Sequence, residues 1–245
     1  MARRKHAFDF KQFSVQQDRC AMKVGTDGIL LGAWTEVEDC KQILDIGTGT
    51  GLIALMVAQR APLAKIDAVE MDQDACNQAQ ENIERSPWCD RISVYSDRIQ
   101  NFAQNCSQQY DLIICNPPYF VNSAPSPQRS RHIARHSDQL SQIELLEIAL
   151  LLLKPQGKLS LIYPYNLAFK LIQQSAQLNL ICDRLTLVKP TPHSQIKRSL
   201  IQLTASSITQ SAVNLSTATV ITIESQKHSY TEEFSTLVKD FYLYL

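Results

Sequence analysis

The chain has 245 residues, enough for one domain with a substantial buried core. Its 24 basic and 24 acidic residues cancel, which excludes capture of nucleic acid by net charge and leaves that task to local basic patches. No apolar run approaches the ~18 residues of a membrane span, and the basic start lacks the apolar segment of a secretory signal. The seven cysteines are scattered, odd in number and without a C-x-x-C spacing. They favour reduced thiols, so we expect a cytoplasmic protein.

Apolar strands and helices alternate from residue 41 onward. This alternation, with near-continuous apolar strands, predicts an α/β fold: a Rossmann-like, doubly wound, mostly parallel sheet of seven strands. No helix separates the last two strands, so they should form an antiparallel hairpin at one edge. The predicted strands are 42–47, 65–71, 91–96, 110–115, 158–164, 180–189 and 199–206, and the helices are 51–61, 72–86, 141–154 and 166–178.

The remaining segments are predicted as additions within a single domain that spans residues 1–245. Residues 1–40 form an N-terminal segment, 41–206 the core with every catalytic candidate described below, and 207–245 a C-terminal extension. Within the extension, 218–225 could add an eighth, peripheral strand, and 230–245 is predicted as a closing helix.

A glycine-rich loop, LDIGTGTG, follows the first strand and opens the first helix. Gly47 and Gly49 permit a tight turn and close approach of a ligand, and Gly51 permits close packing of the helix. Glu70 ends the second strand about 20 residues later, where an acid can accept from ribose hydroxyls. The G-x-G-x-G spacing departs from the dinucleotide fingerprint, and Asp45 before the loop disfavours a pyrophosphate but suits an ammonium group. These residues predict S-adenosyl-L-methionine, which has an amine, a ribose and an adenine but no phosphate.

A third acid, Asp97, follows the third strand and should face the same crevice. Its carboxylate could accept from the exocyclic amine of the cofactor's adenine. It could equally cap the next turn, and the sequence leaves both interpretations open.

The fourth strand runs directly into Asn-Pro-Pro-Tyr, residues 116–119. Parallel sheets bind ligands beyond the carboxyl ends of their strands, so Asn116 should face the glycine loop. The prolines remove two N–H groups, so the Asn116 side-chain oxygen and the Pro117 carbonyl can both accept from one planar amine. Tyr119 offers a flat face on which a base can stack. These three residues are the catalytic candidates, and they would act by positioning an amine rather than as a strong base.

The tetrad resembles the D/N-P-P-Y/F motif of amino-methyltransferases, which act on adenine N6, guanine N2 or a glutamine amide. With FKQFSVQQDRCAMKVGTDGILLGAW (10–34), the glycine loop and ENIERSPW (81–88), it is similar to a bacterial family that methylates N6 of the adenine beside the anticodon of valine tRNA. This resemblance runs over most of the chain and weakens after about residue 205.

The resemblance implies a class I methyltransferase fold, a tRNA substrate, and a lid-like segment at 1–40 that brings Lys23 to Asp27 near the cofactor. It also implies roles residue by residue. The amine site comprises Asn116, Pro117 and Tyr119, and the cofactor site comprises Asp45, Gly47, Gly49, Gly51, Glu70 and Asp97.

Three basic clusters could contact RNA although the chain as a whole is neutral. Arg129, Arg131 and Arg135 follow the tetrad, KPTPHSQIKR (189–198) joins the last two strands, and the chain starts with MARRKH. Two of these clusters should lie at the mouth of the crevice, where arginines can bind phosphates and stack on unpaired bases. Solvated polar loops are the alternative. His132 and His136 have helical spacing but no third ligand nearby, so we expect no metal site.

The leading hypothesis is a monomeric methyltransferase that uses S-adenosyl-L-methionine and acts on N6 of an adenine in the anticodon loop of tRNA. A first alternative keeps this chemistry but takes guanine N2 of ribosomal RNA, adenine of DNA or a protein glutamine as substrate. A nicotinamide oxidoreductase would leave Asn-Pro-Pro-Tyr without a role. A non-catalytic RNA-binding module would leave Asn116 and Tyr119 unexplained.

Overall fold

One large β-sheet organises the molecule. The computed structural model describes residues 7–117, 140–206 and 218–245. Along the chain these residues form β1 (Ala7–Asp9), β2 (Ser14–Gln16), α1 (Thr26–Trp34), β3 (Gln42–Ile46), α2 (Leu52–Arg60), β4 (Lys65–Glu70), α3 (Gln73–Glu84), β5 (Ile92–Ser96), α4 (Ile99–Asn105), β6 (Tyr110–Cys115), α6 (Gln142–Leu152), β7 (Leu153–Pro164), α7 (Tyr165–Gln177), β8 (Leu180–Lys189), β9 (Arg198–Ala205), β10 (Thr219–Thr222), β11 (Glu224–Gln226), β12 (Ser229–Tyr230) and α8 (Glu232–Val238).

The strands of this sheet have the order β10-β8-β9-β7-β6-β3-β4-β5. All neighbouring pairs are parallel except those of β9, which pairs antiparallel with both β7 and β8. The predicted doubly wound, mostly parallel sheet is thus confirmed. It has eight strands rather than seven, because β10 pairs in parallel with the end of β8. This strand lies within residues 218–225, where the sequence indicated an optional eighth, peripheral strand. The hairpin β8–β9 therefore lies one strand inside the edge where we expected it.

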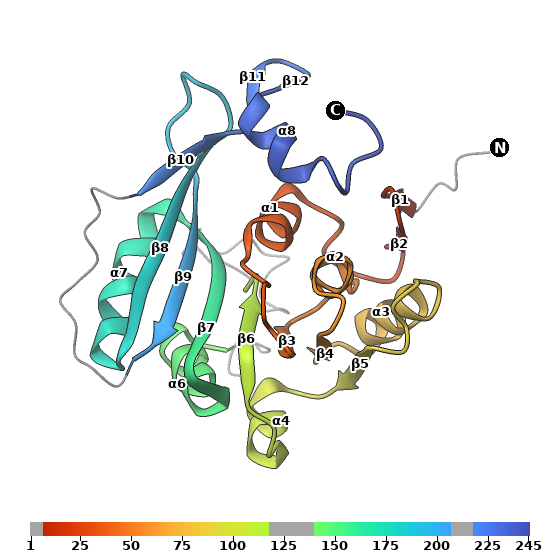
Figure 1. The fold of residues 1–245 in the computed structure, drawn as a ribbon, viewed down its shortest axis with the longest axis vertical. Helices are drawn as coiled ribbons and strands as arrows, with labels where there is room; N and C mark the ends of the chain where they lie inside the picture. Colours follow the sequence, from red (N-terminus) through yellow and green to blue (C-terminus); the bar gives the residue numbers. More distant parts are fainter. Residues whose placement is uncertain (1–6, 118–139, 207–217) are drawn as a thin grey trace, which may run out of the picture.

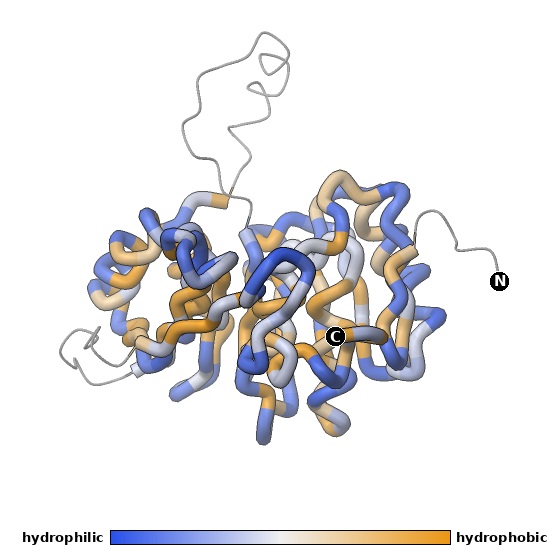
Figure 2. Tube along the Cα trace, turned by 90° about the horizontal axis from the view of Figure 1, so that it is seen from above, coloured by the Kyte–Doolittle hydropathy of each residue, from blue (hydrophilic) through white to orange (hydrophobic). Residues whose placement is uncertain are grey.

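Helices cover both faces of the sheet (Figure 1). The helices α1, α2, α3 and α8 share one hydrophobic core, and α4, α6 and α7 share a second core on the other face. Ile43 belongs to the first core and Leu44 to the second, because successive side chains of a strand point to opposite faces. Hydrophobic and hydrophilic stretches accordingly alternate along the chain (Figure 2). Burial on both faces explains why the strands read as continuous apolar runs.

Four features differ from the predictions. The helix predicted at 141–154 ends at Leu152, since the chain is already extended at Leu153 and enters β7. The closing helix predicted at 230–245 is the shorter α8. The helix α4 and the hairpin β1–β2 were not predicted.

The helix α1 also lies where no core element was predicted. All residues from Gly28 to Trp34 are buried. A Cβ added at Gly32 would lie 2.9 Å from the Met56 sulfur, so glycine permits the close approach of α1 and α2. A lid-like role for residues 1–40 stays a prediction, whereas α1 itself is part of the buried fold.

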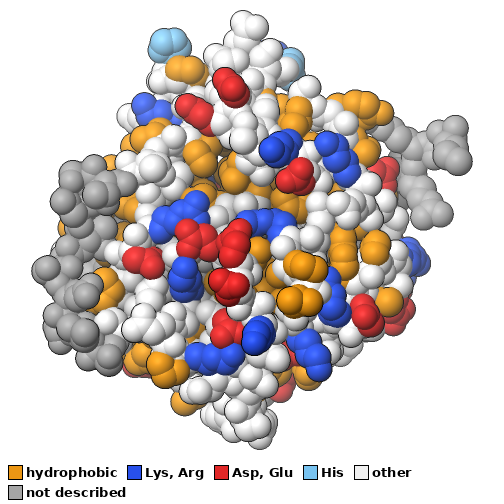
Figure 3. All heavy atoms as spheres, in the orientation of Figure 1, with side chains coloured by type: hydrophobic (Ala, Val, Ile, Leu, Met, Phe, Trp, Pro, Cys, Tyr) orange, Lys and Arg blue, Asp and Glu red, His pale blue; other side chains and the backbone are white. Residues whose placement is uncertain are grey.

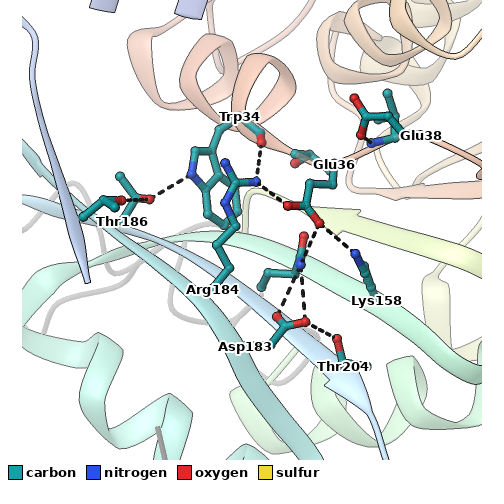
Figure 4. Close-up of polar contacts among 12 residues, drawn as sticks. Trp34, Glu36, Glu38, Lys158, Asp183, Arg184, Thr186 and Thr204 are labelled. Atoms are coloured by element: carbon teal, nitrogen blue, oxygen red, sulfur yellow. Dashed lines mark hydrogen bonds and ion pairs between the residues drawn. The ribbon is translucent and has the colours of Figure 1, made fainter. Parts of the chain in front are cut away.

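Polar contacts hold the carboxyl-terminal end of α1 against β7 and β8 (Figure 4). The Trp34 indole N–H donates to Thr186 Oγ1 at 2.9 Å, and the Arg184 guanidinium lies 4.2 Å from the Trp34 ring centroid. Glu36 forms ion pairs with Lys158 at 2.7 Å and with Arg184 at 3.4 Å. The hydrogen bond from Lys158 holds the pKa of Glu36 below its usual value. Because these contacts fix the carboxyl-terminal end of α1, its amino-terminal end also has a defined position. That end, with Asp27, lies near the carboxyl end of β7.

Acidic and basic side chains lie next to one another near the middle of the face shown in Figure 3, as expected for a chain with balanced charges. Within the described residues, no helix is long and apolar enough to cross a membrane.

Candidate active site

Two cavities open where the carboxyl ends of the parallel strands meet. The first cavity, of about 290 Å³, is lined by residues that include Gly47, Gly49, Glu70, Asp97, Asn116 and Pro117. The second cavity, of about 610 Å³, is lined by residues that include Lys23, Thr26, Asp27, Thr50, Leu52 and Arg198. Both cavities have five residues in common: Met22, Gly47, Gly49, Asn116 and Pro117. A ligand in one cavity would therefore adjoin a ligand in the other.

The glycine loop lies between these cavities in a conformation that only glycine adopts readily. Gly47, Gly49 and Gly51 have φ angles of +70°, +57° and +81°. Gly47 and Gly49 line both cavities. Gly51 lines neither of them, and an added Cβ there would lie 3.5 Å from Ala79. It permits the start of α2 to pack against α3, so its contribution to a cofactor site would be indirect.

Glu70 lies at the end of β4 in the wall of the first cavity. Its Oε2 accepts a hydrogen bond from the Gly49 N–H at 2.9 Å, and its Oε1 accepts from the Asp72 N–H at 2.9 Å. The carboxylate thus connects the glycine loop to the start of α3. A role in binding ribose hydroxyls stays a prediction, and the position of Glu70 in the cavity wall is compatible with it.

Asp45 is buried behind the glycine loop and lines neither cavity. Its Oδ2 accepts from Thr48 Oγ1 at 2.6 Å, and its Oδ1 has no hydrogen-bond partner among the described residues. Burial raises the pKa of Asp45 to about 7, with a smaller contribution from the charge of Glu70. The Thr48 hydroxyl and the Ala54 N–H oppose this rise. A cationic group nearby would stabilise the charged carboxylate.

We expect this carboxylate to make stability depend on pH. Because the pKa of Asp45 is raised in the folded state, its contribution to stability is full below about pH 4 and is lost as the pH rises through about 7. Between pH 5 and 8, the free energy of unfolding of the wild type should fall by about 2–3 kcal/mol relative to that of Asp45→Asn. Urea unfolding of the cofactor-free proteins at several pH values measures this difference. The exposed Asp90→Asn is the control, and equal pH profiles for Asp45→Asn and wild type would contradict the prediction.

Asp97 lies in the wall of the first cavity, directly after β5. Its Oδ1 accepts from the Arg98 N–H at 2.7 Å and from Asn101 Nδ2 at 3.0 Å, so it does order the start of α4. Its position is compatible both with capping of this turn and with acceptance of a hydrogen bond from the cofactor's adenine amine. Arg98 and Ile99 line the same cavity and were not predicted. Their position just after the end of β5 was the signal in the sequence that could have identified them.

Asn116 and Pro117 directly follow β6, in the middle of the sheet. Cys115 pairs in register with Ile46, which brings Asn116 to the level of Gly47 on the neighbouring strand. Both residues line both cavities, so they lie where the two cavities meet. The other predicted site residues, Tyr119, Arg129, Arg131 and Arg135, lie outside the described residues.

The N-terminal segment contributes wall residues that the motifs did not indicate. Cys20 lines the first cavity and Met22 lines both. Asn82 of α3 holds this segment in place: its Nδ2 donates to Gln16 O and to Thr50 O, each at 2.9 Å, and its Oδ1 accepts from the Gln16 N–H at 2.8 Å. A buried amide on the apolar side of a helix was the signal in the sequence, because such a group needs partners.

One basic cluster reaches the site through the hairpin β8–β9. Arg198 starts β9 and pairs in register with Pro164, at the carboxyl end of β7. Its Nε lies 2.8 Å from Asp27 Oδ2, and both residues line the second cavity. Across the described ranges, no group of three His, Cys, Asp or Glu side chains could hold a metal ion.

The first cavity fits a cationic, phosphate-free cofactor. Glu70 and Asp97 line it as hydrogen-bond acceptors, and Asp45, behind the loop, has a carboxylate oxygen without a hydrogen-bond partner among the residues that the structure describes. A Cβ built at Gly47 would meet no described atom within 4 Å, so the backbone is open to a ligand there. Ribose hydroxyls, an adenine amine and an ammonium group match these acceptors. S-adenosyl-L-methionine has all three.

Comparisons with known proteins decide the family. Residues 23–179 match the methyltransferase small domain family. A tRNA1(Val) (adenine(37)-N6)-methyltransferase from Trichodesmium erythraeum (strain IMS101) is 49% identical and covers 96% of this chain and 97% of its own length. The protein of the same name from Parabacteroides distasonis is 46% identical, with the same coverage. The chain belongs to the tRNA1(Val) (adenine(37)-N6)-methyltransferase family. The family resemblance stated from the sequence is thereby confirmed.

Solved structures confirm the fold class of this methyltransferase family member. A "predicted O-methyltransferase" from Agrobacterium tumefaciens superposes with a TM-score of 0.66 at 19% identity, covering 88% of this chain and 96% of that one. TYW2 from Pyrococcus horikoshii, solved in complex with MeSAdo, has a TM-score of 0.55 at 14% identity and covers 81% of this chain and 70% of that one. At such identities the likeness shows a shared class I methyltransferase fold only.

Proposed function

We propose that this protein transfers a methyl group from S-adenosyl-L-methionine to N6 of adenine 37 in the anticodon loop of a valine tRNA. The observation that carries the proposal is the position of Asn116 and Pro117 in the walls of both cavities. A cofactor in one cavity and a base in the other would meet at these residues. The relatives that match nearly the whole chain carry this activity in their name.

The first cavity would hold the cofactor. Glu70 would accept from the ribose hydroxyls, Asp97 from the adenine amine, and Asp45 would stabilise the ammonium group from behind the loop. When bound, S-adenosyl-L-methionine supplies an electrophilic methyl group on a sulfonium centre. Gly47 leaves room for the methionine part at the point where both cavities meet.

The amine site acts by orientation. The Asn116 side-chain oxygen and the Pro117 carbonyl would each accept one hydrogen of the adenine N6 amine, which directs the nitrogen lone pair toward the first cavity. A strong base is not needed, because N6 becomes acidic once it has gained a methyl group and then loses a proton to solvent. Tyr119 would stack on the target base, and Arg129, Arg131 and Arg135 would bind RNA phosphates.

The proposal includes a cytoplasmic monomer that works without a metal. The division into a lid-like segment (1–40), a catalytic core (41–206) and a C-terminal extension (207–245) also belongs to it. The first alternative retains the chemistry and changes the acceptor to guanine N2 of ribosomal RNA, adenine of DNA or a protein glutamine.

Methylation of a defined tRNA tests this function. We expect the purified protein to form N6-methyladenosine in an unmodified valine tRNA transcript, detected by mass spectrometry of the digested nucleosides. A transcript with guanine in place of adenine 37 is the control and should give no product. Methylated guanine N2, or product only with DNA or protein, would support the alternative instead.

A further inference from the structure

We infer that the second cavity receives the target nucleotide of the RNA, and that Arg198, held by Asp27, binds the phosphate beside the target adenine. This inference rests on the proposed function, since it names the part of the same site that takes the nucleic acid. It assigns the phosphate to a residue outside the glycine loop and the Asn-Pro-Pro-Tyr tetrad.

The antiparallel strand β9 brings Arg198 to the end of the sheet where the parallel strands have their carboxyl ends. The Arg198–Pro164 pairing sets the start of β9 beside the end of β7. The Lys197 N–H donates to Val188 O at 2.9 Å, and Lys197 O accepts from the Tyr165 N–H at 3.1 Å. The guanidinium therefore extends from a well-anchored strand end rather than from a loop, which favours precise positioning of a ligand.

The second cavity has the size and the charges for a nucleotide. Its volume of about 610 Å³ lies within the usual range of small-molecule sites. Lys23, Arg198 and Asp27 line it, so cations outnumber acids. The cofactor that fits the first cavity has no phosphate. A phosphate near Arg198 would therefore belong to the substrate, and the base attached to it could reach Asn116 in the shared wall.

The ion pair with Asp27 gives the guanidinium a fixed orientation. Arg198 Nε and Asp27 Oδ2 are 2.8 Å apart, and the side chains are 34% and 30% exposed. Arg198 Nη1 also donates to Lys197 O at 3.2 Å. Because a guanidinium has five N–H donors in a rigid fork, it can bind a carboxylate and a phosphate at the same time. An ion pair this exposed adds little to stability. Asp27 is the positioning residue, and the contacts of Trp34 and Glu36 fix the far end of its helix.

Four variants test this assignment: Arg198→Ala, Arg198→Lys, Asp27→Asn and, as a control, Arg85→Ala. Arg85 is 59% exposed and lies at the end of α3, outside both cavities. The measurements are KM for the valine tRNA transcript, the Kd of S-adenosylhomocysteine, and the slope of log Kd for tRNA against log salt concentration.

For Arg198→Ala we expect KM for tRNA to rise about 10-fold while the Kd of S-adenosylhomocysteine is unchanged, as for the loss of one charged contact to the substrate alone. The salt slope should become shallower by about 0.7–0.9, the change for one lost phosphate contact. Arg198→Lys should keep the wild-type slope with a smaller rise in KM, because lysine retains the charge but not the fork. Asp27→Asn should raise KM modestly, and Arg85→Ala should match the wild type.

Two results would overturn the inference while the proposed function stands. One is a wild-type KM and salt slope in Arg198→Ala, which would leave the residue without a substrate contact. The other is an equal loss of S-adenosylhomocysteine affinity, which would assign Arg198 to the cofactor's carboxylate. If Arg198→Ala fails to fold, Arg198→Lys decides, and wild-type KM there overturns the inference. Wild-type protein that methylates no tRNA would refute the proposed function itself, and the inference with it.

Discussion

Replacing Asn116 by alanine should lower the turnover number by about 100-fold or more, as the loss of one preorganised polar partner at a reacting group does. Asn116 lies where the two cavities meet, and alanine has no oxygen to accept a hydrogen of the target amine. The Kd of S-adenosylhomocysteine should stay within about twofold, because orientation of the amine, rather than cofactor binding, is lost. Single-turnover methylation of the valine tRNA transcript measures the effect on the chemical step.

Two further variants sharpen this test. Asn116→Asp retains an acceptor oxygen at the same position, so it should keep more activity than Asn116→Ala. Asn77→Ala removes an exposed amide from α3, far along the chain from β6, and should behave as the wild type. Wild-type turnover in Asn116→Ala, or a large loss of cofactor affinity, would remove the assigned role.

The sheet and its glycine loop could be predicted because their signals are local. Apolar runs, glycine spacing and a polar residue at a strand end each depend on a few neighbouring residues, and parallel strands place such ends at one edge. The helix α1 was missed because it is apolar and buried on all sides from Gly28 to Trp34, so beyond its first turn it lacks the polar face that marks an amphipathic helix.

Other features of the site could not be predicted, since they depend on tertiary contacts. The pair Asp27–Arg198 joins residues 171 positions apart, and no spacing rule connects them. Asp45 has its carboxylate behind the glycine loop rather than in a cavity wall, because Thr48 bonds to it from within the loop. The sequence indicates that an acid precedes the loop but not the direction in which its side chain points.

The positions of the site residues show how the carboxyl ends of the strands are organised for a reaction with two substrates. Glu70 ends β4 and Asp97 follows β5, both on one side of β3, whereas Arg198 comes from β9 on the other side. Asn116 follows β6, which lies between β3 and β7. The order of strands therefore separates groups for a cofactor from groups for a substrate, with the amine site between them. Such a crevice is where open α/β sheets bind ligands.

Glu70→Ala should weaken the binding of S-adenosylhomocysteine by roughly 10–100-fold, the loss expected for a hydrogen-bonded charged group. Two causes could produce this loss. Glu70 would accept from the ribose hydroxyls, and it also holds the glycine loop through the Gly49 N–H at 2.9 Å and the start of α3 through the Asp72 N–H at 2.9 Å. Calorimetric titration of the single variant gives the total effect but does not separate the two causes.

A double-mutant cycle with an altered ligand separates them. An analogue of S-adenosylhomocysteine without the two ribose hydroxyls should bind the wild type more weakly than the parent ligand does. If Glu70 accepts from those hydroxyls, the same change of ligand should cost Glu70→Ala almost nothing, because the interaction is already absent. If Glu70 only orders the loop, the change of ligand should weaken binding equally in both proteins. Equal losses would therefore exclude the ribose role and leave Glu70 as a support for Gly49, which a lowered unfolding temperature of the cofactor-free variant would reveal independently.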